Sequence, residues 1–138
     1  MKNKLEYSRK DDVKELEHLN WGSDLEEILG LWTNTNSNTG HIVKVEITFE
    51  NGNYYIHAHG AGLEEGELVD WGKVKCEVYY SDISSNSIAG IEAICDFGFM
   101  ETKMAALIKY GILVIQTYNA FKDKSNRSNY LLREFFRQ

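Results

Sequence analysis

The clearest pattern in the chain is an alternation of apolar and polar residues over residues 41–49. Every second residue is apolar, as in a strand with one buried face: Val43, Val45, Ile47 and Phe49. The Asn51-Gly52 pair that follows suits a type I′ turn, because both central residues of that turn need a positive φ. Such a turn pairs Phe49 with Tyr54, Ile47 with Ile56, and Val45 with Ala58. The apolar faces then match, so this stretch predicts an antiparallel β-hairpin.

Similar alternation and short turns predict strands over most of the remaining chain. They are expected at residues 31–36, 70–80, 88–97, 99–108, 112–121 and 129–137. With the hairpin, this makes about eight antiparallel strands in sequence, joined mostly by short loops. A meander of this kind leaves exposed edges unless it closes. We therefore expect an all-β fold, an up-and-down antiparallel barrel, with a β-sandwich as the alternative.

The pattern leaves open whether such a barrel is hollow or filled, and which strand face lines its interior. About eight strands enclose a space just wide enough for one small ligand. Four phenylalanines at strand positions could instead fill a small barrel: Phe97, Phe99, Phe121 and Phe135. A hollow barrel favours ligand binding, and a filled one favours a role for its outer surface.

Residues 1–30 are predicted to be an N-terminal tail with short capping helices, and residues 31–138 the barrel domain. Apolar residues at helical spacing predict a helix over residues 10–19. A capping box that begins at Ser23 predicts a second short helix over residues 24–29. The fold class therefore includes a short helical segment before the barrel.

Charge and composition narrow the classes of partner. The 138 residues carry 15 Lys and Arg against 21 Asp and Glu, a net charge of −6. Without a basic stripe, we expect no nucleic-acid partner. No apolar run approaches the roughly 20 residues that span a membrane, and the N-terminus lacks a signal-peptide pattern. We therefore expect a cytoplasmic protein with no membrane partner.

The two cysteines, Cys76 and Cys95, are predicted to be buried free thiols. They lie on neighbouring predicted strands, and pairing across the turn places Cys76 opposite a residue near Ile91. The remaining offset to Cys95 is on the order of 13 Å along the strand. That separation is too large for a disulfide.

The segment Gly30-Leu31-Trp32-Thr33-Asn34 resembles the opening strand of the calycin superfamily, which includes lipocalins, fatty-acid-binding proteins and avidins. The resemblance implies a lipocalin-like barrel with Trp32 closing one end. The chain departs from avidins in having only Trp21 and Trp71 besides Trp32. It departs from fatty-acid-binding proteins in the spacing of Arg127-Ser-Asn-Tyr130, which is one residue longer than their Arg-x-Tyr.

Longer motifs are similar to an uncharacterised bacterial family. They are Trp32-Thr-Asn-Thr-Asn, Asp70-Trp71-Gly72, Asp96-Phe97-Gly98-Phe99-Met100-Glu101-Thr102, and residues 121–130. No activity is known for that family. This resemblance therefore supports the barrel fold and implies no function.

His57 and His59 lie two positions apart on one face of a predicted strand, a spacing that suits a metal ion. The hairpin register, however, places His57 beside Glu46 and His59 beside Lys44, on the charged face. A third and a fourth ligand cannot be placed from the sequence. We therefore expect surface histidines, no metal and no cofactor, unless the polar face lines the barrel.

Candidate ligand-binding residues are the aromatic and charged residues of the motifs: Trp32, Asp96, Glu101, Arg127 and Tyr130. An arginine can hold an anionic group bidentately, and paired carboxylates can act as acid and base. The carboxylates considered also include Asp70 and Asp123. In a ligand-binding barrel, Trp32 would form the floor and the loop of residues 60–68 would gate the mouth.

Three functions follow, and the first is favoured. The protein binds a small apolar or mixed ligand in the barrel, or it is a filled barrel that acts through its surface, as a homo-oligomer or protein-interaction module. The third reading is a small isomerase or hydrolase that uses Asp or Glu with Arg127. No nucleophile elbow, phosphate loop or dinucleotide fingerprint is present in the sequence, so no catalytic residue is assigned. A non-catalytic role is therefore favoured and catalysis stays open.

Overall fold

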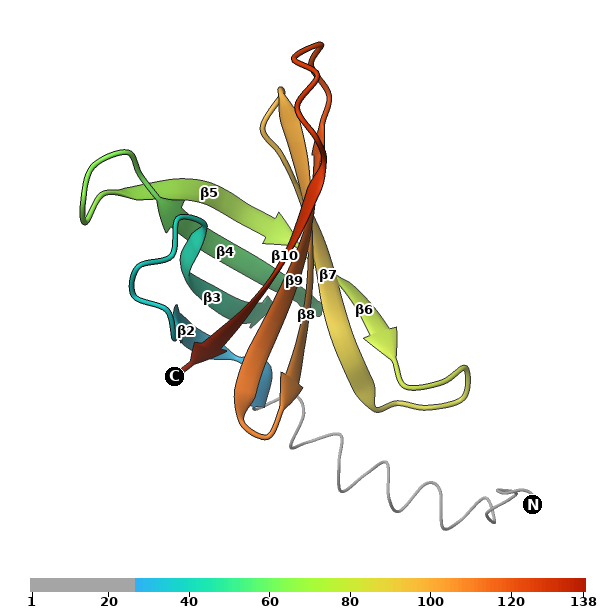
Figure 1. The fold of residues 1–138 in the computed structure, drawn as a ribbon. Helices are drawn as coiled ribbons and strands as arrows, with labels where there is room; N and C mark the ends of the chain where they lie inside the picture. The colour runs from blue at the N-terminus through green and yellow to red at the C-terminus, as the bar shows by residue number, and fades with distance from the viewer. Residues whose placement is uncertain (1–26) are drawn as a thin grey trace.

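The computed structural model describes residues 27–138, which form one antiparallel sheet curled into a nearly closed barrel (Figure 1). The strands are β2 (Gly30–Asn34), β3 (Ile42–Glu50), β4 (Asn53–Ala61), β5 (Leu68–Lys75), β6 (Glu77–Tyr80), β7 (Ile88–Asp96), β8 (Met100–Lys109), β9 (Ile112–Phe121) and β10 (Tyr130–Arg137). Hydrogen-bonded neighbours follow the order β5-β4-β3-β2-β10-β9-β8-β7-β6. The predicted all-β, up-and-down antiparallel barrel is confirmed.

Strands β5 and β6 are two halves of one passage of the chain, separated only by Cys76. β5 pairs with β4 and β6 pairs with β7, so this passage joins the two edges of the sheet. At the crossing point, the Cys76 N–H donates to the Tyr54 carbonyl at 2.8 Å. Counted as one passage, β5 and β6 reduce the nine strands to eight, the number that the sequence predicts. The closure covers strand edges that would otherwise be free to pair with another chain.

The hairpin of β3 and β4 has the predicted register: Phe49 pairs with Tyr54, Ile47 with Ile56, and Val45 with Ala58. Asn51 and Gly52 have φ values of 53° and 82°, the positive values that a type I′ turn requires. Two positions of the predicted buried face differ: Phe49 is 50% exposed near the end of β3, and Val43 gives its place to Ile42. Ile42 is buried and Val43 is only half-buried, because the register shifts between Ile42 and Lys44. At the start of β3, this bulge therefore exchanges the positions that point into the barrel and out of it.

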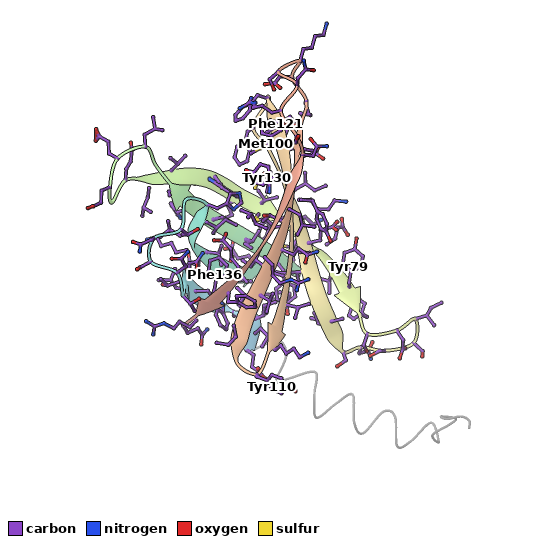
Figure 2. All side chains as sticks on the ribbon, in the orientation of Figure 1. Tyr79, Met100, Tyr110, Phe121, Tyr130 and Phe136 are labelled. Atoms are coloured by element: carbon purple, nitrogen blue, oxygen red, sulfur yellow. The ribbon has the colours of Figure 1, made fainter. Side chains whose placement is uncertain are left out.

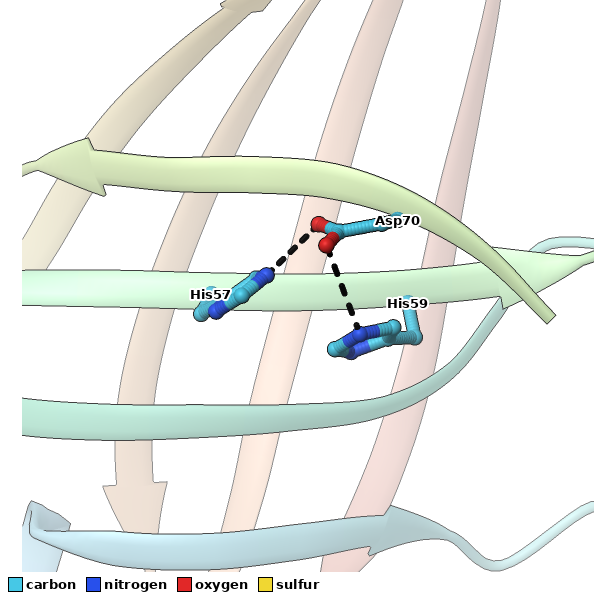
Figure 3. Close-up of side chains that lie close together, drawn as sticks. All are labelled: His57, His59 and Asp70. Carbon is cyan, nitrogen blue, oxygen red and sulfur yellow. Dashed lines mark hydrogen bonds and ion pairs between the residues drawn. The ribbon is translucent and has the colours of Figure 1, made fainter.

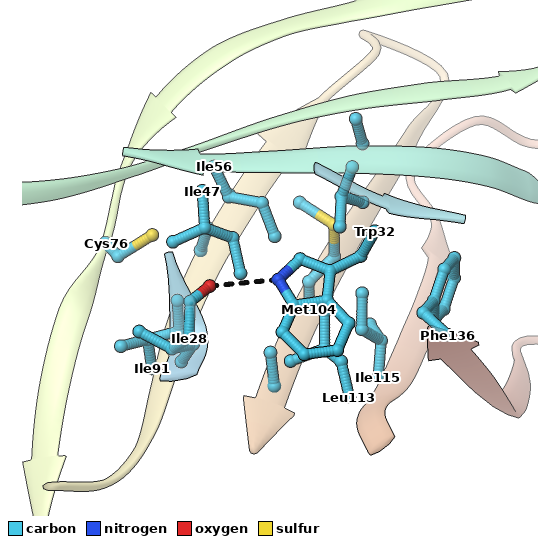
Figure 4. Close-up of a cluster of buried hydrophobic side chains, with 14 of the residues drawn as sticks. Ile28, Trp32, Ile47, Ile56, Cys76, Ile91, Met104, Leu113, Ile115 and Phe136 are labelled. Carbon is cyan, nitrogen blue, oxygen red and sulfur yellow. Dashed lines mark hydrogen bonds between the residues drawn. The ribbon is translucent and has the colours of Figure 1, made fainter. Parts of the chain in front are cut away.

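Trp32 lies at the centre of the apolar core (Figure 4). Its side chain is only 2% exposed, and its Nε1 donates a hydrogen bond to the Ile28 carbonyl at 3.0 Å. Ile28 is the last helical residue before β2, so this bond ties the chain to one end of the barrel, which we call the capped end. The large buried side chains around Trp32 include Ile47, Ile56, Met104, Leu113, Ile115 and Phe136.

The predicted filling by four phenylalanines is wrong for two of them. Phe99 and Phe135 are each 47% exposed, whereas Phe136 is fully buried. Phe136 pairs with the buried Leu113 of β9, and residues that pair directly share a face of the sheet. Phe135 and Phe136 are adjacent and both apolar, so alternation cannot show which of them points inward. The register with the neighbouring strand decides it.

Beyond the apolar core, towards the other end of the barrel, the interior holds a layer of buried polar side chains. Thr102, Thr117 and Asn119 are each at most 1% exposed. Thr102 Oγ1 donates to Asn119 Oδ1 at 2.7 Å, and Asn119 Nδ2 donates to Thr117 Oγ1 at 3.2 Å. These bonds satisfy polar groups that would be costly to bury unpaired. The apolar face of the strands therefore lines the interior, and side chains occupy the interior at both levels.

Cys76 and Cys95 are buried free thiols, as the sequence predicts. Glu77 pairs with Glu92, so Cys76 lies opposite Ala93, two residues closer to Cys95 than predicted. Burial, with a smaller contribution from Cys95, raises the pKa of the Cys76 thiol to about 12. Burial likewise raises the pKa of the Cys95 thiol to about 11. Both side chains act as small apolar residues of the core.

We expect neither thiol to react with Ellman's reagent in the native protein at about pH 8, because the thiolate is the reactive form. In denaturant, both cysteines should react within minutes, since their pKa then returns to about 8.5. The measurement is the absorbance of the released thionitrobenzoate. Rapid reaction of one thiol per native chain would contradict the burial of that cysteine.

The predicted helix over residues 10–19 and the first part of the helix over residues 24–29 lie outside the described residues. Glu27 and Ile28 are helical, in agreement with the end of the second prediction. Within residues 27–138, no helix has both the length and the apolar character to cross a membrane.

Candidate functional site

The end of the barrel opposite Trp32 is lined by aromatic side chains, and we call it the aromatic end. The rings that line it are those of His41, Trp71, Phe97, Phe121 and Tyr130. It lies where β2, β4, β7 and β9 finish and where β3, β5, β8 and β10 begin. Figure 2 places Phe121 and Tyr130 there, far from Tyr110 at the opposite end. The ring centroids of Phe121 and Tyr130 are 6.2 Å apart, and those of Tyr130 and His41 are 6.4 Å apart.

A bulge in β5 determines which face of the sheet Asp70 and Trp71 each take. Between His57 and His59 the pairing of β4 with β5 shifts, so His59 lies opposite Asp70. Gly72 supports the bulge with a φ of 89°, and its N–H donates to Asp70 Oδ1 at 2.7 Å. Asp70 consequently lies on the outer face with the histidines, and the Trp71 ring lies on the inner face.

The same local arrangement occurs at Asp96-Phe97-Gly98, at the end of β7. Gly98 has a φ of 87°, and its N–H donates to Asp96 Oδ1 at 2.8 Å. The two central rings meet edge to face, with the centroids of Trp71 and Phe97 5.1 Å apart. Gly60 makes room for the indole, because a Cβ at that position would lie 2.5 Å from Trp71 Nε1. Two Asp-aromatic-Gly segments thus bring their rings to one place inside the aromatic end.

His41 lies between these rings and the last strand. Its ring centroid is 5.1 Å from that of Trp71, and its side chain is only 11% exposed. His41 Nδ1 lies 3.5 Å from Glu134 Oε1, which is an ion-pair distance and not a well-formed hydrogen bond. Among residues 27–138, neither ring nitrogen has a hydrogen-bond partner, although both are buried. Nδ1 faces Glu134, so Nε2 faces the opposite way.

The Glu134 carboxylate contacts His41, Asn34 and Thr39. Its Oε2 accepts hydrogen bonds from Asn34 Nδ2 at 2.8 Å and from Thr39 Oγ1 at 2.5 Å. Burial raises the pKa of Glu134, but the interactions with His41, Thr39 and Asn34 together outweigh burial and lower the pKa below its ordinary value. Glu134 is therefore an ionised acceptor at neutral pH. It fixes the position of His41 from the side of β10.

Arg127 closes one side of the aromatic end. Its guanidinium lies 4.2 Å from the centroid of the Phe121 ring and 5.5 Å from that of Phe99, distances typical of cation–π contact. Arg127 Nη2 also donates to Asp123 Oδ2 at 2.8 Å. The arginine is half-exposed and already paired, so it stabilises the connection between β9 and β10.

The predicted site residues fall into three places. Trp32 lies in the core at the capped end, whereas Tyr130 belongs to the aromatic end. Asp96 and Glu101 pair directly across β7 and β8, near Arg127 in the fold but not in contact with it in any described interaction. The Lys122 ammonium, 2.7 Å from Asp96 Oδ1, lowers the pKa of that carboxyl together with the Gly98 N–H. An exposed carboxylate held in its ionised form is poorly suited to act as a general acid.

The sequence interpretation missed the central pair of this site, His41 with Glu134. One signal could have found it. Phe136 and Glu134 are two residues apart on β10, so once Phe136 is known to point inward, Glu134 must share the interior face. The choice of Phe135 as the inward residue placed Glu134 on the outside.

The outer face holds the other two histidines of the described residues. His57 pairs with Glu46 and His59 with Lys44, so their predicted positions on the charged face are confirmed. The sequence missed that Asp70 joins them, because the bulge in β5 cannot be read from alternation alone.

The comparisons with known proteins give no assignment. No protein-family model, no curated protein and no solved structure matches this chain.

Proposed function

We propose that the protein binds a small molecule of mixed polar and apolar character at the aromatic end of the barrel. A polar group of that molecule hydrogen-bonds to His41, and its apolar part packs against Trp71 and Tyr130. The observation that carries this proposal is the buried His41 ring, whose nitrogens have no hydrogen-bond partner among residues 27–138.

A buried polar group without a partner costs about 1–3 kcal/mol, so a fold retains one only where something offsets the cost. A bound molecule is one such compensation. The Glu134 carboxylate, with Oε1 3.5 Å from His41 Nδ1, favours the tautomer with the proton on Nδ1. Nε2 is then an acceptor, which favours a ligand with a hydroxyl or N–H group.

The position of the buried polar layer limits the size of the ligand. Thr102 and Asn119 are fully buried directly below the aromatic end. The ligand therefore lies at the mouth of the barrel and not deep inside it, in contrast to the expected floor at Trp32. Tyr130, which is 39% exposed, is the ring that must move to admit it.

A calycin-like architecture agrees with this arrangement. In that reading, the capped end with Trp32 is the closed end of the barrel and the aromatic end is its mouth. The net charge of −6 and the ionised Glu134 favour a neutral or cationic ligand over an anionic one.

Native mass spectrometry of the freshly purified protein, beside the denatured sample, tests the proposal. We expect an added mass in the native spectrum only, and its loss in His41→Phe and Tyr130→Ala, because these variants remove the polar partner and one of the rings. One lost hydrogen bond of this kind lowers affinity by about tenfold.

Tyr118→Ala is the matched control, since Tyr118 is 43% exposed on the outer face of the neighbouring β9. It should keep the added mass. Bare protein in the wild-type spectrum would refute a resident ligand, and a bare, defined oligomer would favour the role of the outer surface. Equal added mass in all variants would place the ligand elsewhere.

A further inference from the structure

Three side chains with metal-ligating atoms converge on the outer face of the barrel: His57, His59 and Asp70 (Figure 3). His57 Nε2 lies 2.6 Å from Asp70 Oδ1, and His59 Nε2 lies 4.0 Å from Asp70 Oδ2. The two imidazole rings stack with centroids 4.7 Å apart and planes 25° apart, so both present Nε2 towards the same carboxylate. One ligating atom from each residue lies within 4.8 Å of the others.

These distances are close to those of a zinc ligand set. Tetrahedral zinc has ligands at about 2 Å, which keeps the ligands about 3.3 Å apart. The two separations to Asp70, 2.6 and 4.0 Å, lie on either side of that value, and all three atoms lie within 4.8 Å of one another, so side-chain rotations bring them to it. Zinc takes the place of the hydrogen bond between His57 Nε2 and Asp70, and each imidazole coordinates zinc through Nε2 as the neutral tautomer with its one proton on Nδ1.

The backbone holds the ligands in place independently of any ion. His57 and His59 share a face of β4 because they are two residues apart. The bulge at Gly72 brings Asp70 onto the same face, and the Gly72 N–H at 2.7 Å orients the carboxylate. An outer hydrogen bond of this kind to a ligating group is a regular feature of metal sites.

The surrounding charges permit a cation. Lys73 lies opposite His57, but its ammonium is bound to Glu50 Oε2 at 2.5 Å and lies over the Tyr55 ring. Lys44 lies opposite His59 on the other side, and the Glu46 carboxylate lies opposite His57. The side chains of His57 and His59 are 30% and 28% exposed, and that of Asp70 is 60% exposed, so an ion can reach them.

We propose that His57, His59 and Asp70 form a zinc-binding site on the outer face of the barrel. Two imidazoles and one carboxylate are a donor set that suits zinc, and the fourth position faces solvent and takes water. The site is separate from the aromatic end and does not depend on the ligand proposed there. The bulge in β5 contributes to both sites, because it places Asp70 on the outer face and Trp71 on the inner face.

Calorimetric titration of the full chain with zinc chloride, after removal of metals with EDTA, tests the site. We expect about one zinc ion per chain, and an affinity lower by at least about tenfold in His57→Ala, His59→Ala and Asp70→Asn. Asp70→Asn keeps an acceptor for the Gly72 N–H, so it removes the charge without removing the bulge. Circular dichroism checks that each variant is folded.

Asp82→Asn is the matched control. Asp82 is an exposed carboxylate that accepts from the Ser84 N–H at 2.9 Å, as Asp70 does from Gly72, but no histidine in the described residues contacts it. It should bind zinc like the wild type. Histidine ring signals in NMR give a second readout, in which zinc should shift those of His57 and His59 and leave that of His41 unchanged. Zinc binding that survives all three substitutions, or no binding at all, would overturn the proposal.

Discussion

Truncation of Trp32 to alanine is expected to lower the free energy of unfolding by about 4 kcal/mol. The side chain is 2% exposed and lies among the largest buried residues, so its loss leaves a cavity that the rigid barrel cannot collapse around. It also removes the hydrogen bond from Nε1 to the Ile28 carbonyl, which holds the capped end. Urea denaturation followed by circular dichroism measures the change.

Leu31→Ala is the matched control, because Leu31 precedes Trp32 on the same strand but is 53% exposed. Its cost should be within about 0.5 kcal/mol of zero, as for other surface substitutions. Trp32→Phe should fall between the two, since it keeps most of the packing and loses the Nε1 bond. Equal losses for Trp32→Ala and Leu31→Ala would contradict the placement of Trp32 in the core.

Replacement of Glu134 by glutamine is expected to lower the free energy of unfolding at neutral pH by about 2 kcal/mol, because hydrogen bonds to a charged acceptor are stronger than those to a neutral one. The bonds at stake come from Asn34 and Thr39, and His41 Nδ1 lies 3.5 Å from the same carboxylate. The pKa of Glu134 in the folded protein is lower than in the unfolded chain, where it is about 4.3. Its contribution is therefore complete above that unfolded value and is lost as the pH falls through the folded pKa.

The measurement is urea denaturation of wild type and Glu134→Gln between about pH 7 and pH 3, where the difference in stability should be largest at the neutral end and shrink below about pH 4. Glu65→Gln, an exposed glutamate of the loop between β4 and β5, is the control and should show little difference throughout. A gap between wild type and Glu134→Gln that stays constant down to pH 3 would show that the charge of Glu134 does not stabilise the fold.

The strands and their order could be predicted because each carries its own local signal. Alternation defines β3 and β7, and Asn51-Gly52 fixes the hairpin register through the φ values that its turn needs. Closure of the barrel follows from the number of strands and the short connections between them. These features depend on residues that are close together in the sequence, so one sequence is enough to predict them.

The positions that the sequence could not place depend on bulges and on neighbouring strands. The bulge at Ile42 exchanged Ile42 for Val43 on the inner face, and the choice between Phe135 and Phe136 depended on the register with β9. A bulge adds one residue to one strand, so every alternation beyond it changes face. Errors of this kind are small in sequence but move side chains from one side of the sheet to the other.

The candidate sites depend most on those features. The bulge at Gly72 decides that Asp70 joins the outer histidines and that Trp71 meets His41 inside the barrel. The motif Asp70-Trp71-Gly72 could be recognised in the sequence as a unit, but which of its first two side chains points into the barrel could not. Of the predicted ligand residues, Tyr130 is the one with a ring contact to His41 in the part of the chain that the structure describes.

The most direct test of ligand binding at the aromatic end is an NMR titration of the indole N–H signals with hits from a small-molecule fragment library. Trp71 lies at the aromatic end and Trp32 lies in the core, so the two signals report on opposite ends of the barrel. We predict that hits shift the Trp71 indole, leave the Trp32 indole in place, and lose this effect in His41→Phe. Hits that shift Trp32 instead, or a Trp71 signal that no fragment moves, would contradict the account.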